Sequence, residues 1–260
     1  DRYASRGLGD VYKRQITGGL SAFADMQIRR VDYEFFGLDN AGDGALQSDA
    51  LTFFNPKLGL NWSFNSGNRL YFSYARGNKE PNRNDYTESS PNSWPKHETL
   101  DDFELGYQRS SRIYTFSANT YFMKYKNQLV LNGQINDVGA YTRVNVPDSY
   151  RLGLELETAI KFAKRFEWKA NATISRNRIK EFIEYVDSYD ENFGWIGQEF
   201  VRYENVELAF SPDIIVNSDF SVDAFNGKTG TKEVTQQLTF SILNKYCLLY
   251  TSDAADDRSC

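Results

Sequence analysis

Apolar and polar side chains alternate with a period of two along much of this chain. In the clearest stretch, residues 151–162, Leu152, Leu154 and Leu156 are separated by glycine and glutamate. Successive side chains of a β-strand point to opposite faces, so this alternation predicts strands with one apolar and one polar face. The same pattern recurs at residues 20–28, 58–64, 70–75, 103–108, 114–122, 166–175, 216–222 and 238–242.

Short and long connections alternate between these predicted strands. The turns at Asn65–Asn68, Ser110–Arg112 and Ala163–Arg165 are only a few residues long, which predicts tight antiparallel hairpins. A glycine-containing turn is also expected at Asn226–Thr231. Four longer polar stretches are expected to be irregular loops: Leu38–Asp49, Asn78–Lys96, Leu131–Ala140 and Ile183–Tyr203.

The length of the alternating segments separates two interpretations. In a soluble β-sheet protein the strands would be about five or six residues long, with their polar faces in bulk water. Here the alternation persists for about ten residues, which is the length that crosses a bilayer at a tilt. This favours a membrane β-barrel whose polar faces line a wet lumen, with the soluble β-sheet protein as the alternative.

In the barrel interpretation, tight turns face the periplasm and long loops face the outside. The apolar set should lie on the convex, lipid-facing side and the charged set on the concave side. The convex set is Leu152, Leu154, Leu156, Trp168 and Ala170, and the concave set is Glu155, Glu157, Glu167 and Lys169.

Composition agrees with a barrel and excludes other classes. Aromatic residues make up 15% of the chain, with 17 tyrosines and 19 phenylalanines, as expected for the aromatic girdles of a barrel. No run approaches the roughly 18 apolar residues of a transmembrane helix. The net charge of −5 argues against nucleic acid as a partner.

Both ends of the chain read as translated adapter DNA. Ser5–Gln15 back-translates to a transposase-type sequencing adapter, and Cys247–Asp256 back-translates to the reverse complement of a companion adapter. We therefore expect residues 1–15 and 247–260 to be artefacts and residues 16–246 to be the natural segment, without its own natural ends. Both cysteines, Cys247 and Cys260, fall outside that segment, so disulfide and thiol chemistry are not expected.

Five segments of the natural part together resemble TonB-dependent outer-membrane receptors. They follow the order and spacing of strands in that family: Phe54–Leu60, Tyr71–Pro81, Glu98–Tyr107, Tyr121–Val130 and Asn145–Leu156. The resemblance implies an all-β, antiparallel, up-and-down transmembrane barrel of about 22 strands with an N-terminal plug. This chain would hold about nine of the later strands, as an open, incomplete meander with unpaired edges near Leu20–Ile28 and Leu238–Ile242.

The same resemblance implies a function and a location. The protein would be an active transporter in the outer membrane of a Gram-negative bacterium, taking up a scarce, bulky nutrient such as a ferric siderophore. Its partners would be outer-membrane lipid, the nutrient, and a TonB complex that acts through the plug domain, which is expected to lie outside this chain. The alternatives are another outer-membrane barrel, either a porin or a barrel enzyme, and a soluble β-rich binding protein.

Candidate chemistry in the sequence is sparse, so we expect no enzyme, cofactor or metal site. The only histidine, His97, has no second histidine or native cysteine beside it and is expected to be a solvated loop residue. Asp187, Asp190 and Glu191 have the oxygen ligands of a hard-cation site, although a solvated loop explains them better. Five aromatic residues in expected external loops are candidates for stacking on a ligand, or else for loop packing: Tyr86, Trp94, Tyr189, Phe193 and Trp195.

Overall fold

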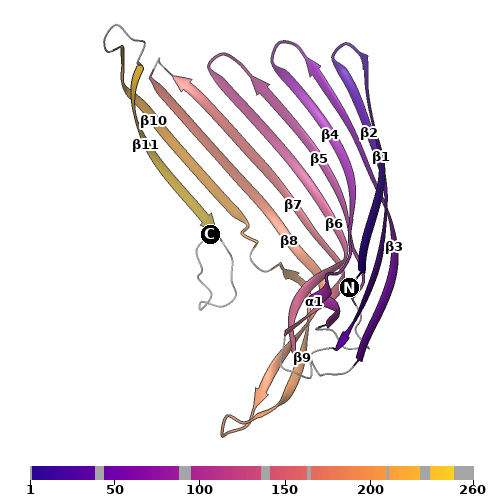
Figure 1. Ribbon diagram of the computed structural model, residues 1–260. Coiled ribbons are helices and arrows are strands. Elements are labelled where there is room, and N and C mark those ends of the chain that lie inside the picture. The colour runs from indigo at the N-terminus through magenta and orange to yellow at the C-terminus, as the bar shows by residue number, and fades with distance from the viewer. Residues whose placement is uncertain are drawn as a thin grey trace.

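The computed structural model is a single curved antiparallel sheet (Figure 1). It describes residues 2–38, 44–87, 95–135, 141–162, 165–208, 211–228 and 235–248. The strands are β1 (Arg2–Thr17), β2 (Leu20–Leu38), β3 (Gly44–Phe64), β4 (Asn68–Lys79), β5 (Glu98–Ser110), β6 (Tyr114–Ile135), β7 (Tyr141–Phe162), β8 (Phe166–Tyr189), β9 (Trp195–Glu207), β10 (Ile214–Lys228) and β11 (Thr235–Leu248). One short helix, α1 (Arg83–Thr87), follows β4. No helix in the described part of the chain is long and apolar enough to cross a membrane.

Neighbouring strands pair in sequence order from β1 to β8, which confirms the predicted open meander. The predicted hairpin registers are present: Leu60 lies opposite Phe72 and Leu154 lies opposite Ile174. The tight turn at Asn65–Gly67 places Asn65 and Gly67 in the left-handed region, with φ of 53° and 89°. Such turns suit asparagine and glycine because these residues tolerate positive φ at low cost.

Strand β9 leaves this simple order. It pairs with the outer half of β8, from Arg178 to Tyr189, whereas β10 pairs with the inner half, from Phe166 to Ile174. Strands β9 and β10 therefore pair with successive parts of the same edge of β8. Together they occupy one strand position in the sheet. If β1 is set aside and β9 is counted with β10, the described sheet is nine strands wide, as the sequence predicts.

The expected open edge at Leu20–Ile28 is covered in the structure. Residues 2–17 form β1 and pair along β2, from Arg2 opposite Glu34 to Thr17 opposite Leu20. A strand edge accepts almost any extended chain, because pairing uses backbone N–H and C=O groups rather than side-chain identity. Residues 2–17 therefore complete the edge of β2 through backbone pairing.

Two of the expected irregular loops are largely regular strand instead. Residues 44–49 belong to β3, and most of Ile183–Tyr203 forms the hairpin of β8 and β9, with Tyr185 opposite Phe200. Their polar composition suggested loops, but a strand that leaves the bilayer no longer needs an apolar face. The polar segments therefore continue the hydrogen-bonded ladder beyond the membrane.

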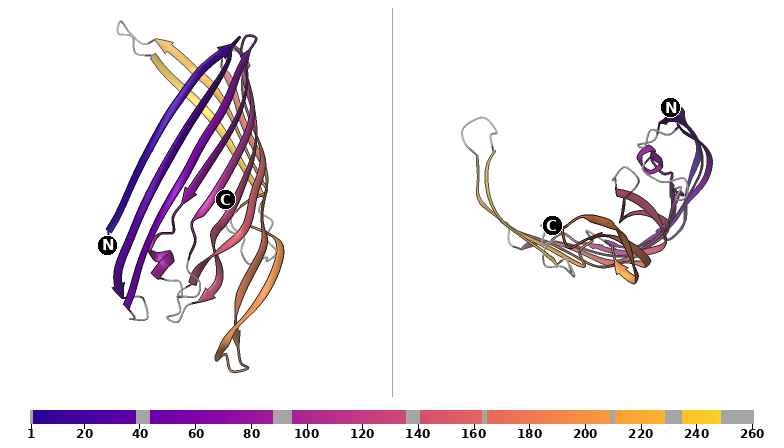
Figure 2. Two further views of the ribbon diagram at one scale, coloured as in Figure 1. Left: turned by 90° about the vertical axis from the view of Figure 1, so that its right-hand side faces the viewer. Right: turned by 90° about the horizontal axis from the view of Figure 1, so that it is seen from below.

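The two faces of the sheet differ as the alternation predicts. Glu155 lies in the same row as Asn119 and Thr173, while its neighbour Leu154 lies in the row of Thr120 and Ile174 on the other face. Helix α1 sits inside the arc of the sheet (Figure 2), and its Tyr86 stacks on Tyr33, which belongs to the polar face of β2. The polar face is therefore concave and the apolar face convex, as expected.

Large apolar side chains are exposed along the convex face rather than buried. They form a continuous belt across β2 to β8, made of Met26, Ile28, Phe54, Leu58, Leu60, Trp62, Phe72, Phe103, Leu105, Phe122, Leu152, Phe162, Phe166 and Ile174. Where the burial of side chains is described, the buried apolar and aromatic residues other than proline are few: Val31, Phe53, Tyr86, Val146 and Ile179. A soluble β-protein would seal its apolar face in a core, so the soluble alternative does not fit this sheet.

The height of the belt matches a bilayer. On β7 it runs from Leu152 to Phe162, a separation of ten residues. At about 3.3 Å per residue this is about 33 Å along the strand. A strand tilt of about 40° reduces that length to roughly 25 Å along the membrane normal, which is the height of the apolar band in outer-membrane barrels.

Glycines on the concave face make room for aromatic rings that lie across the wall. Three times, an aromatic residue sits directly opposite a glycine on the next strand: Phe23 with Gly59, Tyr71 with Gly106, and Tyr121 with Gly153. A Cβ added at Gly153 would lie 2.4 Å from the ring of Tyr121, which no real contact permits. The rings can therefore lie flat on the strands instead of filling the lumen.

A charged substitution in the belt tests the assignment of the convex face to lipid. In the complete barrel, Leu156→Arg should lower the free energy of unfolding in lipid vesicles by about 2–4 kcal/mol, because it places a charge near the middle of the lipid-facing band. Asn171→Arg is the control, since Asn171 is exposed on the concave face and should change stability by less than about 0.5 kcal/mol. Equal losses in the two variants would contradict the facing described above.

Candidate functional site

The sheet is split between β3 and β4 at the end opposite the tight turns. Their pairing stops at Lys57 opposite Ala75. Beyond that point β3 continues with β2 as far as Gly44, and β4 continues with β5 as far as Lys79. Beyond that point the facing edges of β3 and β4 need other partners, because an unpaired backbone group is costly when it is removed from water.

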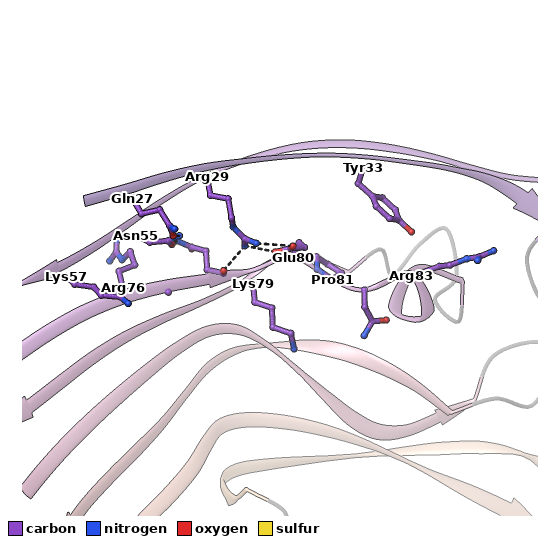
Figure 3. Close-up of a pocket in the computed structure, with 13 residues that line it drawn as sticks. Gln27, Arg29, Tyr33, Asn55, Lys57, Arg76, Lys79, Glu80, Pro81 and Arg83 are labelled. Carbon is purple, nitrogen blue, oxygen red and sulfur yellow. Dashed lines mark hydrogen bonds and ion pairs between the residues drawn. The ribbon is translucent and has the colours of Figure 1, made fainter. Parts of the chain in front are cut away.

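Side chains bridge this split instead of backbone hydrogen bonds. Arg29 of β2 donates to both carboxylate oxygens of Glu80, at 3.1 and 2.6 Å, and to the carbonyl oxygen of Asn78 at 3.1 Å (Figure 3). The side-chain amide of Asn78 donates to the buried Asn55 of β3 at 2.8 Å. These contacts attach the segment that follows β4 to the two strands on the other side of the split.

Helix α1 is fixed in the arc by its own cap and by one buried ring. Asn82 and Asp85 form a reciprocal cap, in which each side chain accepts a hydrogen bond from the backbone N–H of the other, at 3.0 and 2.8 Å. Tyr86 stacks on Tyr33 with ring centroids 5.4 Å apart, and its hydroxyl donates to Asp49 at 3.3 Å. Burial, together with the nearby Asp49 carboxylate, raises the pKa of Tyr86 well above its usual value.

The split contains a cavity of about 740 Å³, lined by β2, β3, β4 and the segment before α1 (Figure 3). Its charged lining residues are five cations and one anion: Arg29, Lys57, Arg76, Lys79, Arg83 and Glu80. Three of the cations are neutralised, because Arg29 pairs with Glu80, Arg76 with Asp101 and Lys79 with Glu98. Lys57 is exposed and has no ion pair within the described part of the chain, so the cavity is suited to an anion.

A second group of candidate residues lies at the tip of the β8–β9 hairpin, which projects beyond the rest of the sheet (Figure 1). Tyr189 is 56% exposed, Phe193 89% and Trp195 57%. Asp190 holds the turn together, since its side chain accepts hydrogen bonds from the backbone N–H groups of Asn192 and Gly194 at 2.8 and 2.7 Å. The three aromatic rings are thus presented on a rigid, hydrogen-bonded turn.

The acidic residues of this hairpin serve its own structure. Asp187 accepts hydrogen bonds from the indole N–H of Trp195 at 3.2 Å and from the side chain of Gln198 at 3.0 Å. Among the described residues no group of three histidine, cysteine or acidic side chains is placed to hold a metal ion. The oxygen-ligand site considered for Asp187, Asp190 and Glu191 is therefore not assembled here.

The structure separates the five candidate aromatic residues. Tyr189, Phe193 and Trp195 share the hairpin tip, whereas Tyr86 is buried under α1 and takes the packing role. Trp94 lies outside the described residues. His97 is not fully solvated as expected, because its ring is half-buried in an edge contact with Phe53, with centroids 5.3 Å apart.

Comparison with known proteins assigns the family. The model of the TonB-dependent receptor-like β-barrel matches residues 23–246. This chain belongs to the TonB-dependent receptor family. The barrel of this receptor lies in the outer membrane of a Gram-negative bacterium.

Solved receptor structures share the fold at low sequence identity. The copper transporter OprC matches with a TM-score of 0.68 at 12% identity, covering 86% of this chain and 34% of that chain. The siderophore receptor PiuA from Acinetobacter baumannii matches with a TM-score of 0.63 at 13% identity, covering 94% and 36%. The alcaligin receptor FauA from Bordetella pertussis matches with a TM-score of 0.54 at 12% identity, covering 94% and 39%. The receptor segment thus spans just over a third of the length of these proteins, and no curated protein matches it.

Sequence reasoning did not identify the cationic cavity of this receptor. Gln27, Arg29 and Tyr33 alternate on the polar face of β2, and Asn55 and Lys57 do so on β3. This alternation could have indicated that cationic side chains gather on the polar face of these two strands. The split that gathers these residues with Glu80 was not predictable, because nothing in the local pattern marks the end of β3–β4 pairing.

The packing role of Tyr86 can be tested by proteolysis of the complete receptor in detergent. Tyr86→Ala should make trypsin cleavage after Arg83 faster, by about tenfold or more, because losing a buried aromatic side chain typically costs about 3–5 kcal/mol. Tyr189→Ala is the matched control, since its ring is exposed and its loss should leave the cleavage rate at Arg83 unchanged. Equal protection in the Tyr86 variant and the parent would show that α1 is held by other contacts.

Proposed function

We propose that residues 16–246 are part of an active outer-membrane transporter for a scarce, bulky nutrient, with ferric siderophores as the leading substrate class. Transport would be energised by a TonB complex acting through a plug domain elsewhere in the protein. No covalent step is proposed, so the receptor would not be an enzyme. The family match carries this proposal, and its span of 23–246 also supports the proposal that the two ends of the chain are adapter-derived.

The concave cavity supports an anionic substrate. Lys57 lines the cavity and has no ion pair among the residues that the structure describes, and the cavity lies near the outer end of the strands. Similar receptors include the ferric-catecholate import receptor Fiu from E. coli K12, which matches with a TM-score of 0.54 at 13% identity. Ferric complexes of such acidic chelators commonly carry negative charge, which a lysine in a partly desolvated lumen would attract.

We also propose that the hairpin tip makes the first contact with substrate. Tyr189, Phe193 and Trp195 are large rings held on an ordered turn, so little conformational entropy is lost when they pack on a ligand. Binding residues concentrate on exposed connections carried by a rigid scaffold, and this hairpin extends β8 directly. The remaining alternative, a porin, needs no such aromatic tip.

The role of Lys57 can be tested by measuring ligand binding to the complete receptor. Lys57→Gln should weaken binding of an anionic ferric siderophore by about tenfold, the value of one charge-assisted contact of ~1.5 kcal/mol, and change binding of a neutral one much less. Lys169→Gln is the control, because Lys169 lies near the tight turns and pairs with Glu167 at 3.2 Å. Equal effects on anionic and neutral ligands would contradict an electrostatic role for Lys57.

The aromatic tip can be tested separately. The triple variant Tyr189→Ala, Phe193→Ala and Trp195→Ala should reduce uptake at limiting substrate by about tenfold or more, as loss of aromatic contacts does at binding surfaces. Barrel assembly should remain intact, as judged by heat-modifiable migration on a gel. Ile113→Ala, an exposed apolar residue at a tight turn, is the control. Unchanged uptake in the triple variant would remove the tip from the binding site.

A further inference from the structure

A second split lies between β7 and β8, at the same end of the sheet as the first. The pairing of these two strands stops at Ser149 opposite Ile179. Beyond that point, among the described residues, β7 pairs only with β6, as far as Tyr141, and β8 pairs only with β9, as far as Tyr189. The facing edges of β7 and β8 therefore have no strand partner in the part of the chain that the structure describes.

The edge of β8 in this split presents a row of open backbone groups. Odd-numbered residues of β8 direct their N–H and C=O groups to the β9 edge, as Asn177 does when its carbonyl accepts a hydrogen bond from the N–H of Leu208 at 3.1 Å. Because backbone groups of a strand alternate between its two edges, Phe182, Glu184 and Val186 direct theirs into the split. Within the described residues, the backbone groups of these three have no hydrogen-bond partner.

The part of the receptor that carries this edge has only two strands. Outward of Arg178, β8 and β9 form a hairpin that projects beyond the rest of the sheet (Figure 1). A two-stranded hairpin is marginally stable in water, and a third strand with an apolar contact stabilises it. A row of open N–H and C=O groups is complementary to another extended backbone. The free edge of β8 is therefore suited to an extended peptide.

A cavity of about 290 Å³ lies in the split beside this edge. Its lining is largely apolar or aromatic and includes Val146 of β7 and Ile183 and Tyr185 of β8. The charged residue of the lining is Glu181, which is already paired with Arg202 at 2.7 Å. An apolar cavity of about 150 Å³ is enough for a benzene-sized ligand, so this cavity has room for one large apolar side chain.

The hairpin also carries a strong negative charge. Residues 178–207 hold eight acidic and three basic side chains, a net charge of −5. The cations are already paired, since Arg178 lies 2.6 Å from Glu207 and Lys180 lies 3.8 Å from Asp148 of β7, and the third binds Glu181. Such a field attracts a cationic segment. The β8 edge and the cationic cavity between β3 and β4 therefore suit different ligands.

We propose that the β8 edge from Lys180 to Val186 binds an extended, cationic segment of an external partner protein. The segment adds a third strand to the hairpin and places one apolar side chain against Val146 and Ile183. Backbone pairing supplies affinity in such a complex, and the side-chain pocket supplies specificity. A strand held between β7 and β8 becomes part of the wall, so the partner docks and is not transported. Docking from outside the cell follows from the expected orientation, with the tight turns toward the periplasm.

Binding of a synthetic peptide to the complete receptor in detergent tests this site. The probe is Lys-Thr-Lys-Leu-Lys-Thr-Lys, which as a strand has its lysines on one face and its leucine at the centre of the other. Replacing the leucine by alanine should weaken binding by about tenfold or more, because three buried carbon atoms are lost. Replacing every lysine by glutamate should weaken it at least as much. Equal binding of all three peptides would overturn the site.

Phe182→Pro isolates the contribution of backbone pairing. Proline at this position removes an N–H that faces the split and no hydrogen bond of the β8–β9 ladder, and proline is tolerated on strand edges. The variant should bind the probe about tenfold more weakly. Phe182→Ala is the matched control for the side chain and should bind nearly as well as the parent. Heat-modifiable migration on a gel checks that both barrels are assembled, and unchanged binding by the proline variant would overturn backbone pairing.

Two further measurements locate the peptide and separate docking from transport. Amide hydrogen exchange should slow at residues 180–186 when the probe binds; slowing confined to the outer edge of β9 would place the peptide on the other edge and overturn the site. On intact cells, bound probe should stay accessible to added protease. Protection of the probe inside the cells would mark it as a transported substrate and overturn the assignment to a docked partner.

Discussion

Every feature of this receptor depends on the rule that backbone polar groups in lipid must find partners within the protein. An antiparallel ladder meets that rule only if neighbouring strands stay in register across the whole bilayer. Neighbouring strands from β2 to β8 keep such a register, as the pairing of Leu60 with Phe72 and of Leu154 with Ile174 illustrates. Outside the bilayer water can satisfy the same groups, so the ladder is free to break.

The candidate site residues lie where this constraint is relaxed. Beyond Lys57 and Ala75 the strands separate, and the space is bridged by side chains such as Arg29 and Glu80. Beyond Arg178 the strand β8 exchanges its partner β10 for β9 and carries the aromatic tip outward. The wall in the membrane thus supports an outer region that holds the cavity and the hairpin tip.

Opposite faces of one strand meet two different environments. Around β7, odd-numbered residues such as Glu155 face the wet lumen, while even-numbered residues such as Leu154 face lipid. Charged side chains such as Glu155 lie on the concave side, and the exposed apolar side chains of the belt lie on the convex side. The period of two therefore separates the lumen-facing surface from the lipid-facing surface within each strand.

The sequence alone determined the strand pattern, the two faces, the tight turns and the family resemblance, because alternation and turn residues act over neighbouring positions. It did not determine where backbone pairing between neighbouring strands ends. The split beside Lys57, the burial of Tyr86 under α1, the contact of His97 with Phe53 and the pairing of β9 with β8 all join residues distant in sequence. Such contacts depend on which strand ends the curved sheet brings together, and only the tertiary structure fixes that.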